Sequence, residues 1–304
     1  MNTRQKSAIL IFVFCLSLCA AFAGYRFISY AHRQGVILAN RKAAWVELKN
    51  ELNSEVGSYK GKAGIVVKDL RTGWKVSFNE DQSFPSASLV KIPIMAASFK
   101  AAQEGKINLD DSMILKGSYK VPGSGILKNV PAGTPVKVSR LMELMVTESD
   151  NTAANMLIDL LGFNYINDYS RHLGLEETNL SRKMMDFRHR RRGVENYTTP
   201  EDMAYILEKI YRKQLLNDGA SQECLNLLIC QRYNDRLPAK LPIGTKVAHK
   251  TGLERNVCHD VGIIFAQKGD LIVCVLTKHL STSRQSKEFI AKVALSAYNY
   301  SQKI

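Results

Sequence analysis

Three short motifs follow one another along this chain, in an order that limits what it can fold into. A Ser-x-x-Lys pattern lies at Ser88–Lys91, a Ser-Asp-Asn tripeptide begins 61 residues after Ser88, and a Lys-Thr-Gly tripeptide begins 101 residues further on. A Ser-x-x-Lys pattern occurs about once by chance in a chain of this length, and each tripeptide about 0.05 to 0.1 times. Because the ordered set is not a chance match, we expect the fold to bring three distant segments to one site.

Runs rich in β-branched and aromatic residues lie near both ends of the chain. Residues 63–70 and 74–78 flank a short glycine-containing turn, which predicts a hairpin. Further strands are predicted at residues 245–251, 259–265 and 271–277, the last two joined by a turn at 266–270. Apolar residues at helical spacing predict one helix from about Val36 to Val56 and a closing helix over about 284–300.

The part of the chain between these strands has mostly helical patterns, from about Ile107 to Leu228. Ser88 is expected near the start of a helix that runs towards Ala102, and helices are expected on both sides of the Ser-Asp-Asn turn. Pairing of the outer strands predicts an α+β fold, in which an antiparallel sheet built from N- and C-terminal strands is flanked by helices and carries an inserted all-helical lobe. We predict one domain over residues 36–304.

The N-terminal segment is a hydrophobic leader. Arg4 and Lys6 precede an uncharged run over residues 7–24, in which Ala21-Phe22-Ala23 fits a small-x-small cleavage site. Residues 1–24 are therefore either a secretory signal peptide or an uncleaved membrane anchor, and residues 25–35 are a spacer. In both cases the domain is expected outside the cytoplasmic membrane, in the periplasm or at the cell surface.

Metal ligands are not grouped in this sequence. The six histidines are scattered, and Cys224, Cys230, Cys258 and Cys274 show no zinc or redox spacing. We predict no metal and no cofactor.

The formal net charge is +14, and it is densest in the basic loop, residues 182–192, which has six Lys or Arg and one Asp. Without aromatic interleaving or a binding motif, and with export expected, nucleic acid is not a predicted partner. Two interpretations stay open. The loop is a solvated surface segment, or it attracts anionic cell-envelope polymers or a substrate carboxylate.

The Ser-x-x-Lys pattern suits nucleophilic catalysis. A serine hydroxyl needs a nearby base, and Lys91 lies one helical turn after Ser88. Among apolar neighbours, desolvation would lower the pKa of Lys91 and make its neutral amine available. An ordinary surface Ser–Lys pair is the alternative interpretation of this motif taken alone.

The other two motifs suit the remaining steps of acyl transfer. Ser149 would relay a proton to the leaving nitrogen and Asn151 would hold a substrate amide, although helix capping is an alternative role for such residues. Lys250 and Thr251 would bind a substrate carboxylate, and Gly252 would let the substrate approach the strand, unless this is an ordinary strand end. The backbone N–H groups of Ser88 and Leu253 are the expected oxyanion donors.

With these motifs the chain resembles the class A β-lactamase family of penicillin-recognising serine enzymes. The likeness covers about residues 36–300, including Phe84-Pro85, the Ser-Asp-Asn-Thr-Ala-Ala-Asn run at 149–155 and Thr198-Thr199-Pro200. It implies an acyl-enzyme on Ser88, with the other motif residues in the roles above. We expect a monomer that acts on a small-molecule β-lactam or a peptidoglycan peptide.

One departure from the family pattern concerns deacylation. Family members that destroy antibiotics carry a Glu-x-x-Leu-Asn segment shortly before Thr-Thr-Pro, whose Glu activates the hydrolytic water. Here Met184, or Lys183 with a shifted gap, stands in its place. Asp186 is a candidate substitute base, or else forms a salt bridge within the basic loop.

Three functions therefore stay open. The first is a β-lactamase-type serine hydrolase that opens β-lactams or a related amide or ester. The second is a D,D-peptidase-like peptidoglycan enzyme. The third is a membrane-tethered penicillin-binding sensor that is acylated once and does not turn over.

Overall fold

Strands from both ends of the chain form one antiparallel sheet in the computed structural model, which describes residues 2–279 and 282–303. The sheet has the order β2-β1-β9-β8-β7, so the first strand pairs directly with the last. The strands are β1 (Gly61–Asp69), β2 (Lys75–Phe78), β7 (Val247–Glu254), β8 (Val257–Ile264) and β9 (Leu271–His279). The predicted α+β architecture is confirmed.

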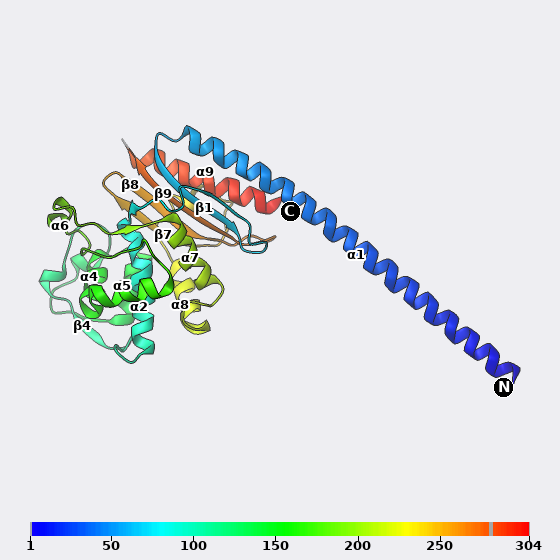
Figure 1. The fold of residues 1–304 in the computed structure, drawn as a ribbon. Coiled ribbons are helices and arrows are strands. Elements are labelled where there is room, and N and C mark those ends of the chain that lie inside the picture. Colours follow the sequence, from blue (N-terminus) through cyan, green and yellow to red (C-terminus); the bar gives the residue numbers. More distant parts are fainter. Residues whose placement is uncertain (1, 280–281, 304) are drawn as a thin grey trace.

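The two faces of the sheet are covered by different helices (Figure 1). On one face lie α9 (Ser283–Gln302) and the C-terminal part of α1 (Thr3–Ser58), and Leu48, Val67 and Phe289 share the core beneath them. The opposite face packs against the helical lobe, where Val66 belongs to a second and larger core. Because side chains alternate along a strand, the neighbours Val66 and Val67 contribute to opposite cores.

The inserted lobe is helical, as predicted. Its helices are α2 (Lys91–Gln103), α3 (Val138–Thr147), α4 (Asn151–Leu161), α5 (Phe163–Leu173), α6 (Phe187–Arg191), α7 (Pro200–Tyr211) and α8 (Asp218–Ile229). It also holds a ribbon of β4 (Ser112–Ile114) and β5 (Pro135–Lys137), which the sequence patterns did not predict. Strands of three residues are too short to show an alternating pattern.

Short segments connect the lobe to the sheet. The two-residue strands β3 (Phe84–Pro85) and β6 (Tyr197–Thr198) pair with each other just before Ser88 and just before α7. Single turns of 3-10 helix are η1 (Ala87–Val90), η2 (Gly117–Tyr119), η3 (Leu127–Asn129) and η4 (Leu237–Lys240).

Helix α1 runs without a break from Thr3 to Ser58, and its N-terminal part extends away from the domain (Figure 1). Residues 25–35, predicted as a spacer, are helical and exposed. The helix predicted to begin at about Val36 therefore has no boundary there, because no proline interrupts α1. The domain end of α1 is held by Arg41, whose guanidinium lies 3.2 Å from the Asp69 carboxylate in the interior. By length and composition, α1 contains a segment that could cross a membrane.

Candidate active site

A cleft of about 820 Å³ lies where η1, the start of α4, the basic loop and the end of β7 meet. The cleft is lined by Ser88 and Asn151, which belong to the first two motifs, and by Leu253, which directly follows the third. The other lining residues are Ala87, Gly123, Ser124, Met184, Met185, Phe187, Arg190, Arg191, Glu254, Arg255 and Asn256.

Ser88 lies in the single turn η1 immediately before α2, rather than inside the long helix. The residue before it, Ala87, has a φ of 46°, in the left-handed region that costs free energy for a residue with a Cβ. Its neighbours Leu89 and Val90 are fully buried, whereas Ser88 is half-buried on the cleft wall. The strained turn thus presents one hydroxyl to the cleft from an otherwise apolar segment.

Lys91 begins α2 and is fully buried. Its Nζ donates to the backbone oxygen of Ser149 at 2.6 Å, to Asn151 Oδ1 at 2.8 Å and to Ser149 Oγ at 3.3 Å. Burial, followed by the nearby charge of Lys250, holds the pKa of Lys91 well below its ordinary value. A lysine with a lowered pKa gives up its proton more readily, as a general base requires.

Lys250 approaches the same hydroxyl from the sheet. Its Nζ donates to Ser149 Oγ at 2.9 Å and to the backbone oxygen of Thr251 at 3.1 Å. Burial lowers the pKa of Lys250 to about 7, against an attraction to Asp260 that raises it. Ser149 itself has a φ of 52°, a second strained residue at this site. A hydroxyl held between two lysines can pass a proton towards a group in the cleft.

The residues of the Ser-Asp-Asn turn have separate roles. Asp150 is structural, because its carboxylate caps α4 through Ala153 N at 2.9 Å and accepts from the backbone N–H groups of Ile126 and Leu127 at 2.7 and 2.8 Å. The capping interpretation therefore applies to the middle residue. Asn151 contacts Lys91 and lines the cleft, where its amide can meet a substrate.

The Lys-Thr-Gly strand packs closely against the nucleophile turn. A Cβ on Gly252 would lie 3.1 Å from the His259 ring and 3.3 Å from Leu89 Cγ, so a larger residue would push β7 away from η1. Thr251 is buried and pairs with Asp260 on β8. Leu253 is half-exposed and lines the same cleft as Ser88.

Two candidate functional residues, Arg236 and Glu254, were not predicted from the sequence. Arg236 is buried, and its Nε forms an ion pair with Asp235 Oδ1 at 3.5 Å, while among the described residues its Nε and Nη1 atoms have no hydrogen-bond partner. It is close enough to Lys250 to lower the pKa of that lysine. Glu254, directly after Leu253, pairs with Arg182 of the basic loop. Neither residue is part of a short motif, so only the tertiary structure reveals them.

The basic loop is tied to the sheet by a buried ionic network. Arg182 Nη2 lies 2.6 Å from Glu195 Oε1 and 2.9 Å from Glu254 Oε1. Arg190 pairs with the same two carboxylates, at 3.1 Å from Glu195 and 3.4 Å from Glu254. Two of the loop's arginines are therefore neutralised within the protein, and the loop is not simply a solvated segment.

Asp186 is not brought to the cleft lining. Its carboxylate caps α6 by accepting from His189 N at 3.0 Å, and it pairs with His189 Nδ1 at 2.6 Å. The backbone N–H of His189 is the main cause of the lowered pKa of Asp186. These contacts match the salt-bridge interpretation rather than a deacylation base.

Met184, not Lys183, faces the cleft. Met184 is buried, and the side-chain amide of Asn155 holds its backbone, accepting from Met184 N at 2.8 Å and donating to Met184 O at 3.1 Å. Lys183 instead pairs with Asp159 at 2.5 Å. The thioether of Met184 thus lines the cleft at the position where the family pattern has a glutamate.

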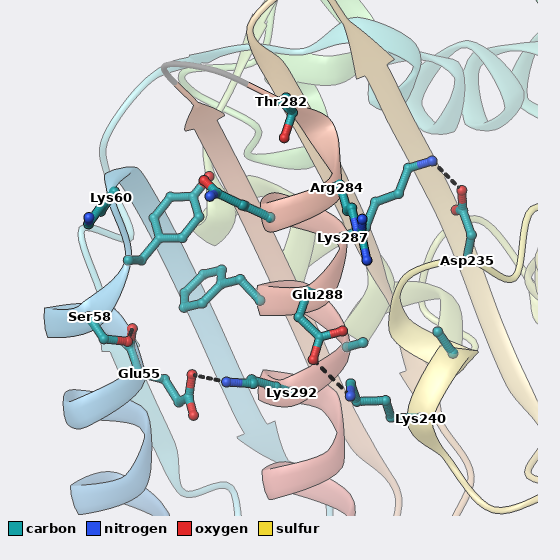
Figure 2. A pocket seen from close by; sticks show the side chains of 15 residues that line it. Glu55, Ser58, Lys60, Asp235, Lys240, Thr282, Arg284, Lys287, Glu288 and Lys292 are labelled. Carbon is teal, nitrogen blue, oxygen red and sulfur yellow. Dashed lines mark hydrogen bonds and ion pairs between the residues drawn. The ribbon is translucent and has the colours of Figure 1, made fainter.

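A second cleft, of about 880 Å³, lies between the end of α1, α9 and η4 (Figure 2). None of the three motifs contributes a residue to it. Its charged side chains pair across it, as Lys287 does with Asp235 at 2.6 Å and Lys240 with Glu288 at 2.8 Å. The described residues also include no group of His, Cys, Asp and Glu placed to hold a metal.

Known proteins that are similar to this chain include β-lactamases and PBP-A. The model of the protein family described as "Beta-lactamase enzyme family" matches residues 47–301. The extended-spectrum β-lactamase PER-1 of Pseudomonas aeruginosa is 28% identical over 84% of this chain and 88% of its own length. A β-lactamase of Sphaerobacter thermophilus superposes with a TM-score of 0.78 at 30% identity, covering 86% of this chain and 98% of that one. The structure of PBP-A superposes with a TM-score of 0.79 at 29% identity, over 85% and 97% of the two chains.

Proposed function

Since the chain belongs to the β-lactamase enzyme family and is a serine hydrolase of the β-lactamase type, we propose that it opens β-lactams through an acyl-enzyme on Ser88. The observation that supports this most is the convergence of Lys91 and Lys250 on Ser149 Oγ, together with the contact of Lys91 with Asn151, which lines the same cleft as Ser88. These contacts support the assignment of Ser88 as nucleophile, Lys91 as base and Ser149 as proton relay.

Acylation begins when the neutral amine of Lys91 takes the proton of the Ser88 hydroxyl, whose oxygen attacks the lactam carbonyl carbon. Negative charge that develops on the carbonyl oxygen is stabilised by the N–H groups of Ser88 and Leu253. The C–N bond of the ring then breaks, and Ser149 passes a proton to the nitrogen while an ester forms at Ser88 Oγ.

Substrate orientation depends on positive charge at the Lys-Thr-Gly strand. Protonated Lys250 and the hydroxyl of Thr251 bind the carboxylate of the β-lactam, and the buried guanidinium of Arg236 adds to the positive potential. Asn151 holds the amide on the acyl side.

Deacylation is proposed to be slow. Met184 cannot accept a proton from water, and the carboxylate of Asp186 is engaged by His189 away from the cleft lining. The similarity to PBP-A, one of whose variants is described as an acyl-enzyme complex with penicillin G, favours as a second function a D,D-peptidase-like enzyme or a penicillin-binding sensor.

The domain is proposed to work outside the cytoplasmic membrane with α1 as its anchor. The apolar segment of α1 is exposed, and it continues as one helix into the domain, where Leu48 and Leu52 are buried. Such an anchor would hold the cleft at a defined height above the membrane surface, whereas cleavage after Ala23 would release the domain.

Intact-mass measurement of the full chain in detergent, after addition of benzylpenicillin, tests the proposed chemistry. We expect one penicilloyl adduct that persists for hours, and no adduct on the Ser88→Ala variant. An adduct on Ser88→Ala would contradict the assignment of the nucleophile, and loss of the adduct within seconds would contradict slow deacylation.

A further inference from the structure

The mouth of the cleft has a basic rim that the proposed acylation does not use. Arg191, in α6, and Arg255, in the turn between β7 and β8, both line the cleft that contains Ser88. They lie 64 residues apart in sequence, and both are exposed. The tertiary fold therefore places two exposed cations in the lining of one cleft.

The charge of this rim is not cancelled by neighbouring carboxylates. Arg182 and Arg190 already share Glu195 and Glu254, so two positive and two negative charges balance within that network. In the part of the chain that the structure describes, no ion pair involves Arg191 or Arg255. The rim is left with two positive charges that face the cleft.

The rim is also held in place from both sides. Arg255 occupies a two-residue turn that Asn256 completes with a φ of 65°. Arg190 Nη2 donates to the backbone oxygen of Arg255 at 3.4 Å, and Glu254 binds Arg182 at the base of the basic loop. These contacts fix the turn to the loop, so that Arg191 and Arg255 belong to one surface.

We propose that Arg191 and Arg255 bind a carboxylate on the acyl portion of the substrate. The proposal rests on the acylation of Ser88 proposed above, and it names the substrate class as anionic peptides and their β-lactam mimics. Lys250 is proposed to bind the terminal carboxylate of such a substrate. The second carboxylate, on the acyl portion, would be bound by Arg191 and Arg255. The exposed ring of Phe187 also lines the cleft, and it offers an apolar surface to the part of the substrate that joins the two carboxylates. A stem peptide of peptidoglycan with a free side-chain carboxylate has this chemistry.

Two penicillins that differ at the end of the acyl chain test the proposal. Adipoyl penicillin carries a terminal carboxylate, and hexanoyl penicillin carries a methyl group on a chain of the same number of carbons. We expect the second-order rate of Ser88 acylation to be about three- to tenfold higher for the adipoyl compound, since exposed ion pairs contribute modestly. Raising the salt concentration should reduce this ratio, because exposed charges are screened.

Arg191→Gln and Arg255→Gln should each lower the adipoyl-to-hexanoyl ratio, and the double variant should bring it close to one. Arg192→Gln is the matched control, because Arg192 is exposed in the same loop and does not line the cleft. The rate with hexanoyl penicillin reports in each variant whether the cleft is still intact.

The outcomes separate the subsite from the function on which it rests. Equal rates for the two penicillins in the unaltered protein, or a ratio that Arg192→Gln lowers as much as Arg191→Gln, would overturn the subsite and leave Ser88 acylation standing. If neither compound labels Ser88, the proposed function fails and the subsite fails with it.

Discussion

Lys250 Nζ donates a hydrogen bond of 2.9 Å to Ser149 Oγ, although 101 residues separate the two in sequence. Both side chains are buried, and this contact joins the end strand of the sheet to the helical lobe. Lys91 approaches the same hydroxyl at 3.3 Å. Because two like charges so close together destabilise each other, protonation of one lysine disfavours protonation of the other. The pair therefore favours one charged lysine and one neutral lysine.

Removal of the shared hydroxyl should slow acylation. We expect Ser149→Ala to lower the rate of Ser88 acylation by benzylpenicillin about 10²- to 10³-fold, since proton transfer by a positioned group contributes on this scale. Stopped-flow measurement of acylation tests this. Ser98→Ala is the control, because Ser98 is also a buried serine but bonds only to its own helix, through Ile94 O at 2.9 Å. Equal rates for the two variants would exclude Ser149 as a proton relay.

The pH dependence of acylation should report Lys250. Its pKa is lowered to about 7, so the lysine is charged below that pH and loses its charge as the pH rises through it. We expect acylation by benzylpenicillin, whose carboxylate needs this charge, to decline above about pH 7. Lys250→Arg keeps a charge at all accessible pH values, so the decline should move to higher pH. An unchanged alkaline limb in Lys250→Arg would mean that another group controls it.

The same pKa shift makes a prediction about stability. Between pH 7 and the ordinary lysine value of 10.5, the unfolded chain binds more protons at this residue than the folded chain. The resulting penalty is full below pH 7 and disappears as the pH rises towards 10.5. We therefore expect Lys250→Met to raise the free energy of unfolding by about 1–3 kcal/mol at pH 7, while impairing acylation. Denaturant titration at pH 7 and pH 10 checks this, and the gain should be smaller at pH 10.

The sequence alone predicted the sheet and most of the helices, because these depend on local patterns. Its three motifs singled out the residues of the candidate site. β1 and β9 contain apolar runs over residues 65–67 and 271–276, and α4 has a capping aspartate at Asp150. The ionic network of Glu254 with Arg182 could not be predicted, since 72 residues separate the partners and no spacing rule relates them. The position of Ser88 in η1 likewise depends on tertiary contacts, whereas Asp186 is engaged locally by His189, three residues further on.

A glycine next to the Ser-Asp-Asn turn should be indispensable. Gly125 has a φ of 106°, and a Cβ there would collide with the carboxylate of Asp150. We expect Gly125→Ala to destabilise the protein by about 1–3 kcal/mol and to slow acylation, because Asp150 orders the turn that holds Ser149 and Asn151.

Gly133→Ala is the matched control for this prediction. Gly133 has a φ of 93° but open space where the Cβ would lie, so its substitution introduces backbone strain without a collision. Thermal unfolding and acylation rates of both variants separate the two effects. Equal losses of stability, with acylation retained in Gly125→Ala, would show that the Asp150 contact does not order the site.

Met184→Glu should convert slow deacylation into turnover. The backbone at this residue is fixed by Asn155 on both its N–H and its carbonyl, so a glutamate side chain would begin from the same point on the cleft wall. A carboxylate near the ester at Ser88 can take a proton from an attacking water, which general-base catalysis makes about 10²- to 10⁴-fold faster. Intact-mass measurement of the benzylpenicillin adduct over time gives its lifetime in the variant and in the unaltered protein.

Met185→Glu is the matched control for this gain of function. Met185 also lines the cleft, but its left-handed φ of 63° directs its side chain differently from that of Met184. A shorter adduct lifetime in Met184→Glu alone would show that the missing carboxylate at this one position limits hydrolysis. An equal shortening in both variants would mean that added negative charge, rather than a positioned base, accelerates the loss of the adduct. An unchanged adduct lifetime in both variants would mean that water does not reach the ester from this side of the cleft.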